Sequence, residues 1–451
     1  MASLSPLYLL LLLLLLIFDQ CNSQNTTTTE CLKLPLLHKR PFVSPTEALL
    51  WDYQRLSALH NRGDPKSPVV SGAPSGSGQY FVSLRLGTPP QTLQLVADTG
   101  SDLVWVKCSA CKTDCSAATH VPGSAFLARH SSTFSPHHCF DSPCRLVPHP
   151  PRSHCNHTSR LHTPCRYQYS YSDGSLTSGF FSKETTTLNT SDGREAKLKS
   201  LAFGCGFRVS GPSLSGASFN GAHGVMGLGR GPISFSSQLG RRFGNKFSYC
   251  LMDYTISPPP TSFLTIGHNV VPRVSRISFT PLQTNPLSPS FYYIGIQSIS
   301  VNGTKLPINP SVWSVDKLGN GGTIMDSGTT LTFLAEPAYR QVLAAFKRRV
   351  RRLPSVAEPT PGFDLCVNVS GVSRPNLPRL RFSLVGNSVF SPPSRNYFIE
   401  TADQVICLAI QPVNSETGPS VIGNLMQQGF LLEFDRERSR IGFSRHGCAL
   451  P

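Results

Sequence analysis

The stretch Asp98-Thr99-Gly100-Ser101 and its copy Asp326-Ser327-Gly328-Thr329 decide the fold of this chain of 451 residues. The two copies lie 228 residues apart, and each follows a short apolar run. Each run predicts a strand that delivers an aspartate to a glycine turn, where a neighbouring hydroxyl group holds the carboxylate. Two carboxylates that face each other share one proton, because like charges about 3 Å apart do not both ionise. Asp98 and Asp326 are therefore candidate catalytic residues that offer one water molecule a base and an acid.

The repetition extends beyond the aspartates. Val225-Met226-Gly227 in the first half of the chain matches Val421-Ile422-Gly423 in the second half. Internal repetition of this kind predicts two similar lobes with the active site at their junction. The alternative for the glycines at 227–231 is a phosphate-binding loop, but they lack the G-x-G-x-x-G spacing and a following Gly-Lys-Ser/Thr. No G-x-S-x-G motif supports a serine hydrolase.

These motifs resemble the pepsin-like aspartic proteases, and the cysteine-rich segment after the first motif resembles the nepenthesin-like, atypical plant members. The match runs nearly continuously from Gly78 to Cys448. The resemblance implies a mainly β, bilobal pepsin-like aspartic protease fold with the active-site cleft between two similar lobes. It also implies roles for residues that support the catalytic pair: Ser101 and Thr329 as hydrogen-bond donors to the carboxylates, Gly100 and Gly328 in the turns, Trp105 behind a flap, and Tyr171 within that flap.

Composition and local patterns divide the chain into four regions. Leu7–Phe18 is an unbroken apolar run of 12 residues, which is too short for a membrane span and typical of a signal peptide. We therefore expect a signal peptide at 1–23 and a prosegment with a processing linker at 24–75, a region that contains no strand repeat. An N-terminal lobe follows at 76–270 with Asp98, the cysteine-rich insert and the flap, and a C-terminal lobe at 271–451 with Asp326. Runs such as Tyr80–Leu86 predict the strands, and Glu336-Pro337-Ala338 predicts a helix start.

The chain holds 14 cysteines, of which Cys21 would leave with the signal peptide and Cys31 with the prosegment. The family resemblance implies six disulfides among the other 12: Cys108–Cys111, Cys115–Cys205, Cys139–Cys165, Cys144–Cys155, Cys250–Cys448 and Cys366–Cys407. Structural zinc is the competing interpretation, because Cys108-Ser109-Ala110-Cys111 is a C-x-x-C motif and eight of the 13 histidines fall between His120 and His162. Thiols of a secreted chain are usually oxidised, and no second C-x-x-C completes a site, so we expect no metal. Five sequons predict glycosylation at Asn25, Asn156, Asn189, Asn302 and Asn368.

The net charge of +16 points to acidic partners without identifying one. Lys347, Arg348, Arg349, Arg351 and Arg352 follow the expected helix start. A solvated basic face is the plain interpretation of this run, since positive charge near a helix C-terminus is favourable. The sharper interpretation is adhesion to acidic cell-wall polymers such as pectin. No nucleic-acid-binding motif supports a nucleic-acid partner.

The sequence thus predicts a secreted aspartic endopeptidase that hydrolyses peptide bonds at acidic pH through a water activated by two aspartates. Its substrates would be proteins or peptides, it would need no cofactor, and it would act as a monomer without a transmembrane segment. We expect it in the extracellular space or cell wall, with the vacuole as the other compartment, and made as a zymogen in which Lys39 or Arg40 pairs with the aspartates. The alternative is a catalytically inactive pepsin-fold binding or inhibitor protein, a kind of relative that loses an aspartate or its glycine loop.

Overall fold

The computed structural model describes most of the chain beyond the expected prosegment, together with short pieces of that prosegment. The described residues are 32–38, 45–46, 48–49, 52–53, 79–109, 125–151, 155, 163–170, 175–189, 194–211, 214, 221–253, 261–267, 277–356, 360–415, 417–445 and 448. All of them belong to one compact unit, Cys31–Pro451. The expected signal peptide, Lys39, Arg40 and the flap residue Tyr171 lie outside the described residues.

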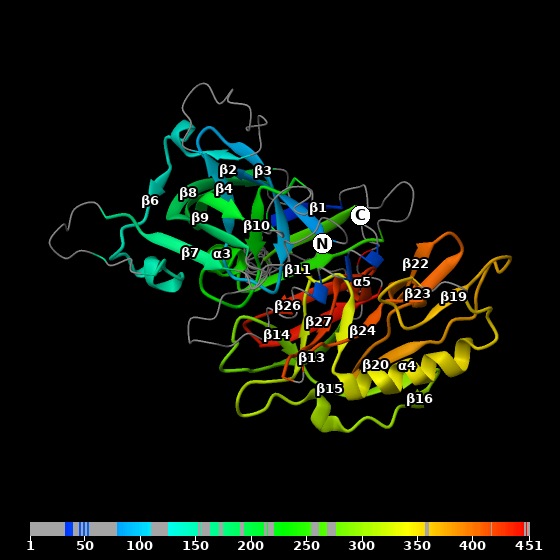
Figure 1. Ribbon diagram of the computed structural model, residues 1–451. Helices are drawn as coiled ribbons and strands as arrows, with labels where there is room; N and C mark the ends of the chain where they lie inside the picture. Colours follow the sequence, from blue (N-terminus) through cyan, green and yellow to red (C-terminus); the bar gives the residue numbers. More distant parts are fainter. Residues whose placement is uncertain are drawn as a thin grey trace, which may run out of the picture. The chain divides into compact units, whose positions relative to one another are not determined.

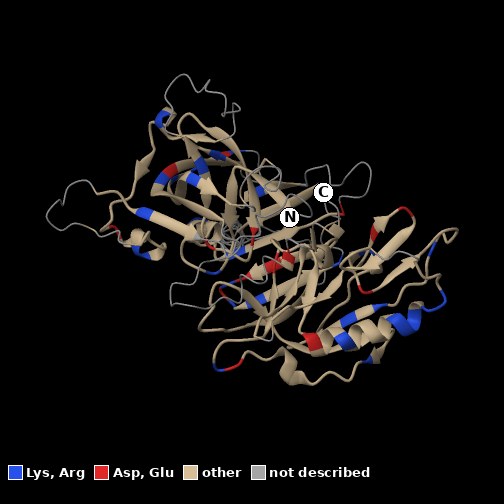
Figure 2. Cartoon of the chain, in the orientation of Figure 1, with Lys and Arg blue, Asp and Glu red and all other residues tan. Residues whose placement is uncertain are grey.

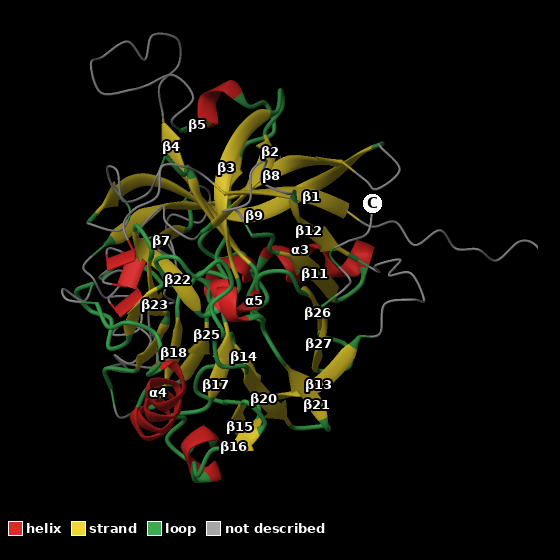
Figure 3. Ribbon diagram, turned by 90° about the vertical axis from the view of Figure 1, so that its right-hand side faces the viewer, coloured by secondary structure: helices red, strands yellow, loops and turns green. Residues whose placement is uncertain are grey.

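Strands dominate the described part of the chain, as predicted, and helices are few (Figures 1 and 3). Ten strands build the surroundings of the two aspartate motifs: β2 (Tyr80–Leu86), β3 (Gln91–Asp98), β4 (Trp105–Ser109), β9 (Glu195–Ser210), β10 (Gly224–Gly227), β14 (Tyr292–Ile294), β17 (Thr323–Met325), β18 (Thr332–Leu334), β24 (Ile410–Pro412) and β25 (Ser420–Ile422). The boundaries of β2 match the run that the sequence predicts as a strand.

The two halves of the chain repeat one strand arrangement. In the first half, β3 lies between β2 and β10, antiparallel to β2 and parallel to β10. Strand β10 then pairs antiparallel with β4, which pairs parallel with β9. In the second half, β14, β17, β25, β18 and β24 follow each other with the same sequence of directions. The repetition predicted from short motifs is therefore a repetition of five-stranded sheet topology.

A further series of antiparallel strands, continuous with the same large sheet, joins the two halves. Its strands follow one another in the order β1 (Leu32–His38), β12 (Ser262–Ile266), β11 (Lys246–Cys250), β26 (Leu431–Asp435), β27 (Arg440–Ser444) and β13 (Ser278–Gln283). The pairing of β11 with β26 links the halves directly, and the Lys246 ammonium lies 2.9 Å from Glu433 across it. Strand β1 belongs to the expected prosegment, where the sequence analysis saw no strand repeat. Its alternating Leu32, Leu34 and Leu36 are buried, and that alternation is the signal that was missed.

Smaller elements complete the described structure. The remaining strands are β5 (Phe126–Leu127), β6 (Ser135–Pro136), β7 (Arg166–Ser170), β8 (Leu176–Asn189), β15 (Ile296–Val301), β16 (Thr304–Lys305), β19 (Cys366–Asn368), β20 (Leu380–Leu384), β21 (Ser388–Phe390), β22 (Phe398–Ala402) and β23 (Val405–Leu408). The described residues of the prosegment at 45–46, 48–49 and 52–53 are helical. The later helical segments are α3 (Phe235–Phe243), α4 (Glu336–Val350), α5 (Asn424–Gln427) and the 3₁₀ turns η1 (Ala128–His130), η2 (Ser142–Leu146), η4 (Pro310–Trp313) and η5 (Ser394–Asn396).

Helix α4 begins at Glu336, as predicted. It buries Ala338, Val342 and Phe346 at helical spacing, so one stripe packs on the core while the rest faces outward. Pro337 lies in its first turn, where a missing backbone N–H costs nothing. The long apolar core beneath it runs through both halves of the chain and includes Tyr292 and Phe434, whose ring centroids lie 4.6 Å apart.

The cysteine pairing differs from the family-based expectation in the insert and agrees with it elsewhere. Cys250–Cys448 and Cys366–Cys407 are joined as expected. The expected pairs Cys108–Cys111 and Cys115–Cys205 are wrong, because Cys108 is bonded to Cys205. The expected pairs Cys139–Cys165 and Cys144–Cys155 are also wrong, because the bonds are Cys139–Cys155 and Cys144–Cys165.

Cα separations are consistent with these corrections. Val106 on β4 lies opposite Cys205 on β9, and the Cα atom of Cys108, two residues further along β4, lies 5.4 Å from that of Cys205. In the insert, the Cα atoms of Cys139 and Cys155 lie 5.8 Å apart, and those of Cys144 and Cys165 also lie 5.8 Å apart. These separations are within the usual range for a disulfide.

Candidate active site

Each candidate catalytic aspartate is held by its own turn in the same way. The carboxylate of Asp98 accepts hydrogen bonds from the Gly100 amide at 3.0 Å and from the Ser101 hydroxyl at 2.5 Å. The carboxylate of Asp326 accepts from the Gly328 amide at 3.0 Å and from the Thr329 hydroxyl at 2.6 Å. Both aspartates are fully buried within the described structure. Each glycine therefore presents its amide to one carboxylate oxygen, and each hydroxyl orients the other oxygen.

The two turns are tied to each other by crossed hydrogen bonds. The Ser327 amide donates to the Thr99 hydroxyl at 2.9 Å, and the Thr99 amide donates to the Ser327 hydroxyl at 3.0 Å. The Ser327 hydroxyl also donates to the Ala97 carbonyl at 2.9 Å. Residues 228 apart in sequence thus lock the two aspartate loops together in the protein interior. Thr99 and Ser327 belong to the two motifs, but the sequence alone predicts no role for them.

Gly227 and Gly423 allow close packing against the backbone that follows each aspartate turn. A Cβ on Gly423 would lie 1.9 Å from the Leu331 carbonyl oxygen, and a Cβ on Gly227 would lie 2.4 Å from the carbonyl carbon of Asp102. Any side chain at these positions would push the strand away from the aspartate loop. Each apolar-apolar-Gly repeat forms or directly follows the strand beside one aspartate motif, since Val225 pairs with Val96 and Val421 with Ile324.

Two buried side chains, Gln427 and Tyr249, support the backbone of the second aspartate through consecutive hydrogen bonds. The side-chain amide of Gln427 donates to the Asp326 carbonyl at 3.2 Å, and its oxygen accepts a hydrogen bond from the Tyr249 hydroxyl. Burial raises the pKa of Tyr249 well above its usual value, and the negative charge of Asp326 adds to this rise. Tyr249 therefore stays protonated and keeps donating. No local motif marks Gln427 or Tyr249, because their contacts span 178 residues.

Asp102, four residues after Asp98, is a further buried carboxylate. It accepts hydrogen bonds from the Gly231 amide at 2.8 Å and from the Ser290 hydroxyl at 2.5 Å. Burial raises the pKa of Asp102, while the hydrogen bonds and the charge of Arg436 oppose the rise. Ser290 precedes β14 in the second half of the chain, so Asp102 links the first aspartate loop to that half.

The flap prediction is supported where residues are described. Strands β7 and β8 pair antiparallel up to Ser170 and Leu176, so the chain reverses between them as a hairpin. Trp105 is buried in the same cluster as Tyr167 and Tyr169 of β7, a position from which it can support the hairpin. The flap role of Tyr171 itself stays a prediction.

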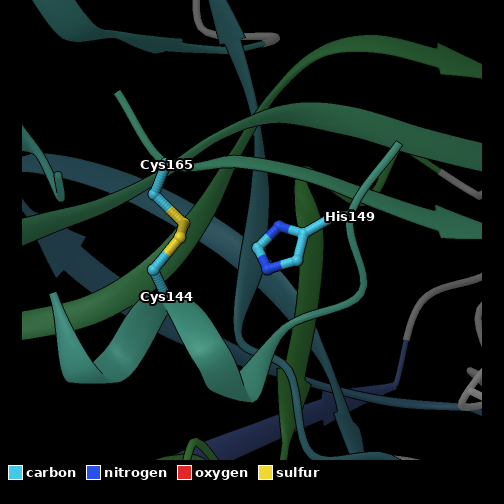
Figure 4. A group of neighbouring side chains, drawn as sticks. All are labelled: Cys144, His149 and Cys165. Atoms are coloured by element: carbon cyan, nitrogen blue, oxygen red, sulfur yellow. A yellow bond between two sulfur atoms is a disulfide. The ribbon is translucent and has the colours of Figure 1, made fainter. Parts of the chain in front are cut away.

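The thiols considered for zinc are oxidised where the structure describes them. Cys108 belongs to a disulfide, and Cys111 lies outside the described residues. One further group, Cys144, Cys165 and His149, brings potential ligand atoms within 4.8 Å of one another. The two sulfurs of this group are bonded to each other, and the imidazole faces them (Figure 4). His149 Nδ1 also contacts the Arg166 carbonyl oxygen at 2.8 Å. A disulfide sulfur is not a thiolate, so this group lacks the ligands of a zinc site.

The predicted surface features that the structure describes fall on exposed or partly exposed positions. Asn189 and Asn302 are exposed and Asn368 is partly exposed, whereas Asn25 and Asn156 lie outside the described residues. The basic residues at the end of α4 gather on one part of the cartoon in Figure 2. Arg349 is partly exposed and donates to the Thr304 hydroxyl at 3.2 Å, and the other basic residues of the run are exposed: Lys347, Arg348, Arg351 and Arg352.

Comparison with known proteins first defines the class. The solved structure of edgp covers 92% of this chain with a TM-score of 0.68 at 24% identity, and basic 7S globulin from soybean covers 92% with a TM-score of 0.64 at 17% identity. The fold is therefore that of the pepsin-like proteins, as predicted. Family models described as "Xylanase inhibitor N-terminal" and "Xylanase inhibitor C-terminal" match residues 80–268 and 291–445.

Sequence relatives then identify the family. "Aspartyl protease family protein 2" of Arabidopsis thaliana is 39% identical over 392 residues, covering 86% of this chain and 74% of that protein. "Aspartic proteinase nepenthesin-1" of Nepenthes gracilis is 35% identical over 397 residues, covering 88% of this chain and 83% of that protein. The chain belongs to the nepenthesin-like, atypical branch of the plant pepsin-like aspartic protease family. None of the helices in the described ranges combines the length and apolar character that a membrane crossing requires.

Proposed function

We propose that this protein is a secreted aspartic endopeptidase that hydrolyses peptide bonds at acidic pH, with Asp98 and Asp326 as its catalytic pair. The observation that carries the proposal is the matched pair of aspartate turns, each with its amide and hydroxyl donors, joined by the crossed bonds of Thr99 and Ser327. Carboxylates whose orientation is fixed in advance lose little freedom when a reaction begins.

The proposed reaction uses one water molecule. One ionised aspartate takes a proton from that water, whose oxygen attacks the scissile carbonyl carbon, while the protonated aspartate donates to the carbonyl oxygen. The tetrahedral intermediate then collapses as the C–N bond breaks, and the leaving nitrogen receives a proton. The two oxygens of each carboxylate differ in their partners. The Ser101 and Thr329 hydroxyls donate to the Oδ2 atoms, whereas the Gly100 and Gly328 amides donate to the Oδ1 atoms. Activity needs one proton on the pair, so it falls as the pH rises through the upper macroscopic pKa of the pair.

The competing function is that of an inactive binding or inhibitor protein. The family models that match this chain carry the description "Xylanase inhibitor", which keeps this alternative open. Against it, both aspartates and both glycine loops are intact in the sequence, and their donors are in place.

The deciding experiment is cleavage of a peptide library by the purified, acid-treated protein over a range of pH. Cleavage that is strongest below pH 7 and blocked by pepstatin supports the proposal. A profile that peaks above pH 7, or no cleavage combined with tight binding of a xylanase, supports the competing function. The same preparation allows glycan release and N-terminal sequencing, which test the proposed glycosylation and the proposed conversion from a zymogen.

A further inference from the structure

The glycine run at residues 227–231 surrounds a carboxylate of the chain itself. Asp102, which is 7% exposed, accepts a hydrogen bond from the Gly231 amide at 2.8 Å. A Cβ on Gly229 would lie 2.3 Å from Oδ1 of Asp102, and a Cβ on Gly231 would lie 2.1 Å from Oδ2. Side chains at these two positions would therefore collide with the carboxylate, and the glycines leave the room that Asp102 fills.

The glycine run is also bonded to the first aspartate turn. The Leu228 amide donates to the Asp98 carbonyl at 2.8 Å, and the Gly229 amide donates to the Ser101 carbonyl at 2.8 Å. Ser101 is the residue whose hydroxyl orients the Asp98 carboxylate. A displacement of the glycine run therefore moves the backbone on both sides of the turn that holds Asp98.

The second half of the chain holds the glycine run from the other side. The Ser290 hydroxyl donates to Asp102 at 2.5 Å, and the Ser290 carbonyl accepts from the Arg230 amide at 3.0 Å. The Tyr292 hydroxyl, on β14, donates to the Leu228 carbonyl at 2.7 Å. Strand β14 pairs with β17, which leads into the second aspartate motif. Asp102 thus lies where the first aspartate turn meets a segment that is paired to the strand of the second.

Arg436 and the Ser290 hydroxyl make this link durable. Arg436, directly after β26, donates to the Arg230 carbonyl at 2.9 Å and to the Ser236 hydroxyl at 3.1 Å, so it fixes the end of the glycine run. A hydroxyl group both donates and accepts, so Ser290 can stay bonded to Asp102 whether that carboxyl group is ionised or protonated. The link therefore persists over the acidic range in which activity is proposed.

The second repeat lacks this arrangement. Four positions after its aspartate it has Thr330, where the first repeat has Asp102. Two and four positions after its matching glycine it has Leu425 and Gln427 in place of glycines. The second copy forms the same order of strands without the carboxylate and without the glycines. The strand arrangement therefore does not require them, and they belong to the Asp98 turn alone.

We infer that Asp102 is a positioning residue for the proposed reaction: by joining the glycine run to Ser290, it sets the position of the Asp98 carboxylate relative to the second half of the chain. The inference rests on the proposed function, because what Asp102 sets is the alignment of the two proposed catalytic aspartates. Asp102 acts through the Gly231 amide and the Ser290 hydroxyl and not on the substrate. Its loss should therefore lower kcat and leave KM nearly unchanged.

The experiment compares the purified, acid-treated wild type with Asp102→Ala, Asp102→Asn, Ser290→Ala and the double variant Asp102→Ala/Ser290→Ala. Asparagine keeps the size of Asp102 and an acceptor for the Gly231 amide, while its NH₂ group donates to the Ser290 hydroxyl. Asp403→Ala is the matched control, because Asp403 is an exposed carboxylate in the turn between β22 and β23.

Two quantities are measured on each protein. The first is the pair of constants kcat and KM for peptide cleavage at one acidic pH, with kcat expressed per active site titrated with pepstatin, so that a smaller folded fraction does not count as slower turnover. The second is hydrogen exchange at the Gly100 amide, whose acceptor is the Asp98 carboxylate. Exchange at this amide reports on the aspartate turn without any need for activity.

We expect Asp102→Ala to lower kcat by roughly 10- to 100-fold, the cost of a misplacement of up to about 1 Å, and to speed exchange at Gly100. Asp102→Asn should recover most of the rate, and Asp403→Ala should match the wild type. Ser290→Ala should lower kcat in the same direction, and the double variant should fall no further than Asp102→Ala, because both substitutions remove one link.

An unchanged kcat per titrated site in Asp102→Ala, even with lower stability, would show a merely structural role and overturn the inference. Losses that multiply in the double variant would also overturn it. Should Asp102→Ala fail to fold, Ser290→Ala decides, and unchanged turnover with unchanged exchange in that variant rejects the inference. If the wild type cleaves no peptide, the proposed function fails instead, and exchange at Gly100 alone then decides whether Asp102 positions the Asp98 turn.

Discussion

At the scale of single residues, the site depends on short polar side chains that bond across large sequence distances. Thr99 and Ser327 each donate and accept in the interior, and together they hold the two aspartate turns in one position. A buried amide that loses its acceptor costs more than the average hydrogen bond contributes, because it also lost water on folding. Residues without any chemical role in the reaction thus set the geometry of the candidate pair.

Thr99→Val should test this interlock. The substitution preserves the side-chain shape but leaves the buried Ser327 amide without its acceptor, so the free energy of unfolding should fall by about 1–3 kcal/mol. Thr99→Ser is the control, since it keeps the hydroxyl. Chemical denaturation of the three proteins provides the measurement, and equal stability of the Val and Ser variants would argue against the interlock.

Asp102 should make stability depend on pH in a direction opposite to most carboxylates. Burial raises its pKa in the folded protein, so the folded state binds the proton more tightly than the unfolded state does. Relative to Asp102→Asn, the wild type should then lose stability as the pH rises from about 3.9 through the raised folded pKa. Thermal unfolding of both proteins between acidic and neutral pH measures this difference. A wild type that gains on the variant as the pH rises would show that the sign is wrong.

At the scale of elements, the same five-stranded arrangement surrounds each aspartate. The motifs were sufficient to predict the aspartate strands and the internal repeat that includes Gly227 and Gly423, because a few local signals mark each of them. They were not sufficient for β1, Gln427 or the cysteine pairing of the insert. These depend on register and on contacts between distant segments, which local patterns do not encode. The expected disulfides rest on resemblance alone, and the structure revises the pairs that involve the insert.

Gly423→Ala should disrupt the second repeat. Its Cβ would lie 1.9 Å from the Leu331 carbonyl oxygen, so β25 must move away from the aspartate loop. We expect little folded protein at 37 °C and no activity. Gly303→Asn is the control, since nothing lies within 4 Å of a Cβ at that position and Asn tolerates its positive φ of 82°. Normal expression of the Gly423 variant alongside normal activity would contradict the close packing.

At the scale of the whole molecule, long-range links hold the two halves and the chain end together. The shared series of antiparallel strands passes from β12 to β13 through strands of both halves. Cys250 on β11 is bonded to Cys448, 198 residues later, which fastens the C-terminal region to the first half. A closed loop of this length restricts the unfolded chain strongly in the chain-entropy model. Such links keep the two aspartate turns facing one another.

Disulfide mapping should recover the revised pairing. Proteolysis without reduction, followed by mass spectrometry, is expected to give peptides joined through Cys108–Cys205, Cys139–Cys155 and Cys144–Cys165. The Cα atoms of these pairs lie 5.4, 5.8 and 5.8 Å apart, within the usual range for a disulfide. Recovery of Cys139–Cys165 instead would mean that the insert has another register, and free thiols with bound zinc would restore the metal interpretation.

The central claim is that Asp98 and Asp326 act as one catalytic unit, and the double-mutant comparison of Asp98→Asn, Asp326→Asn and the combined variant tests it most directly. Asparagine can keep the hydrogen bonds of Gly100 and Gly328, so thermal unfolding should change little. We expect kcat/KM for peptide cleavage at acidic pH to fall by roughly 10³-fold or more in each single variant, and no further in the double variant, because residues that act as a unit are not additive. Near-normal cleavage by either single variant, with its fold intact, would show that the two aspartates are not a catalytic unit.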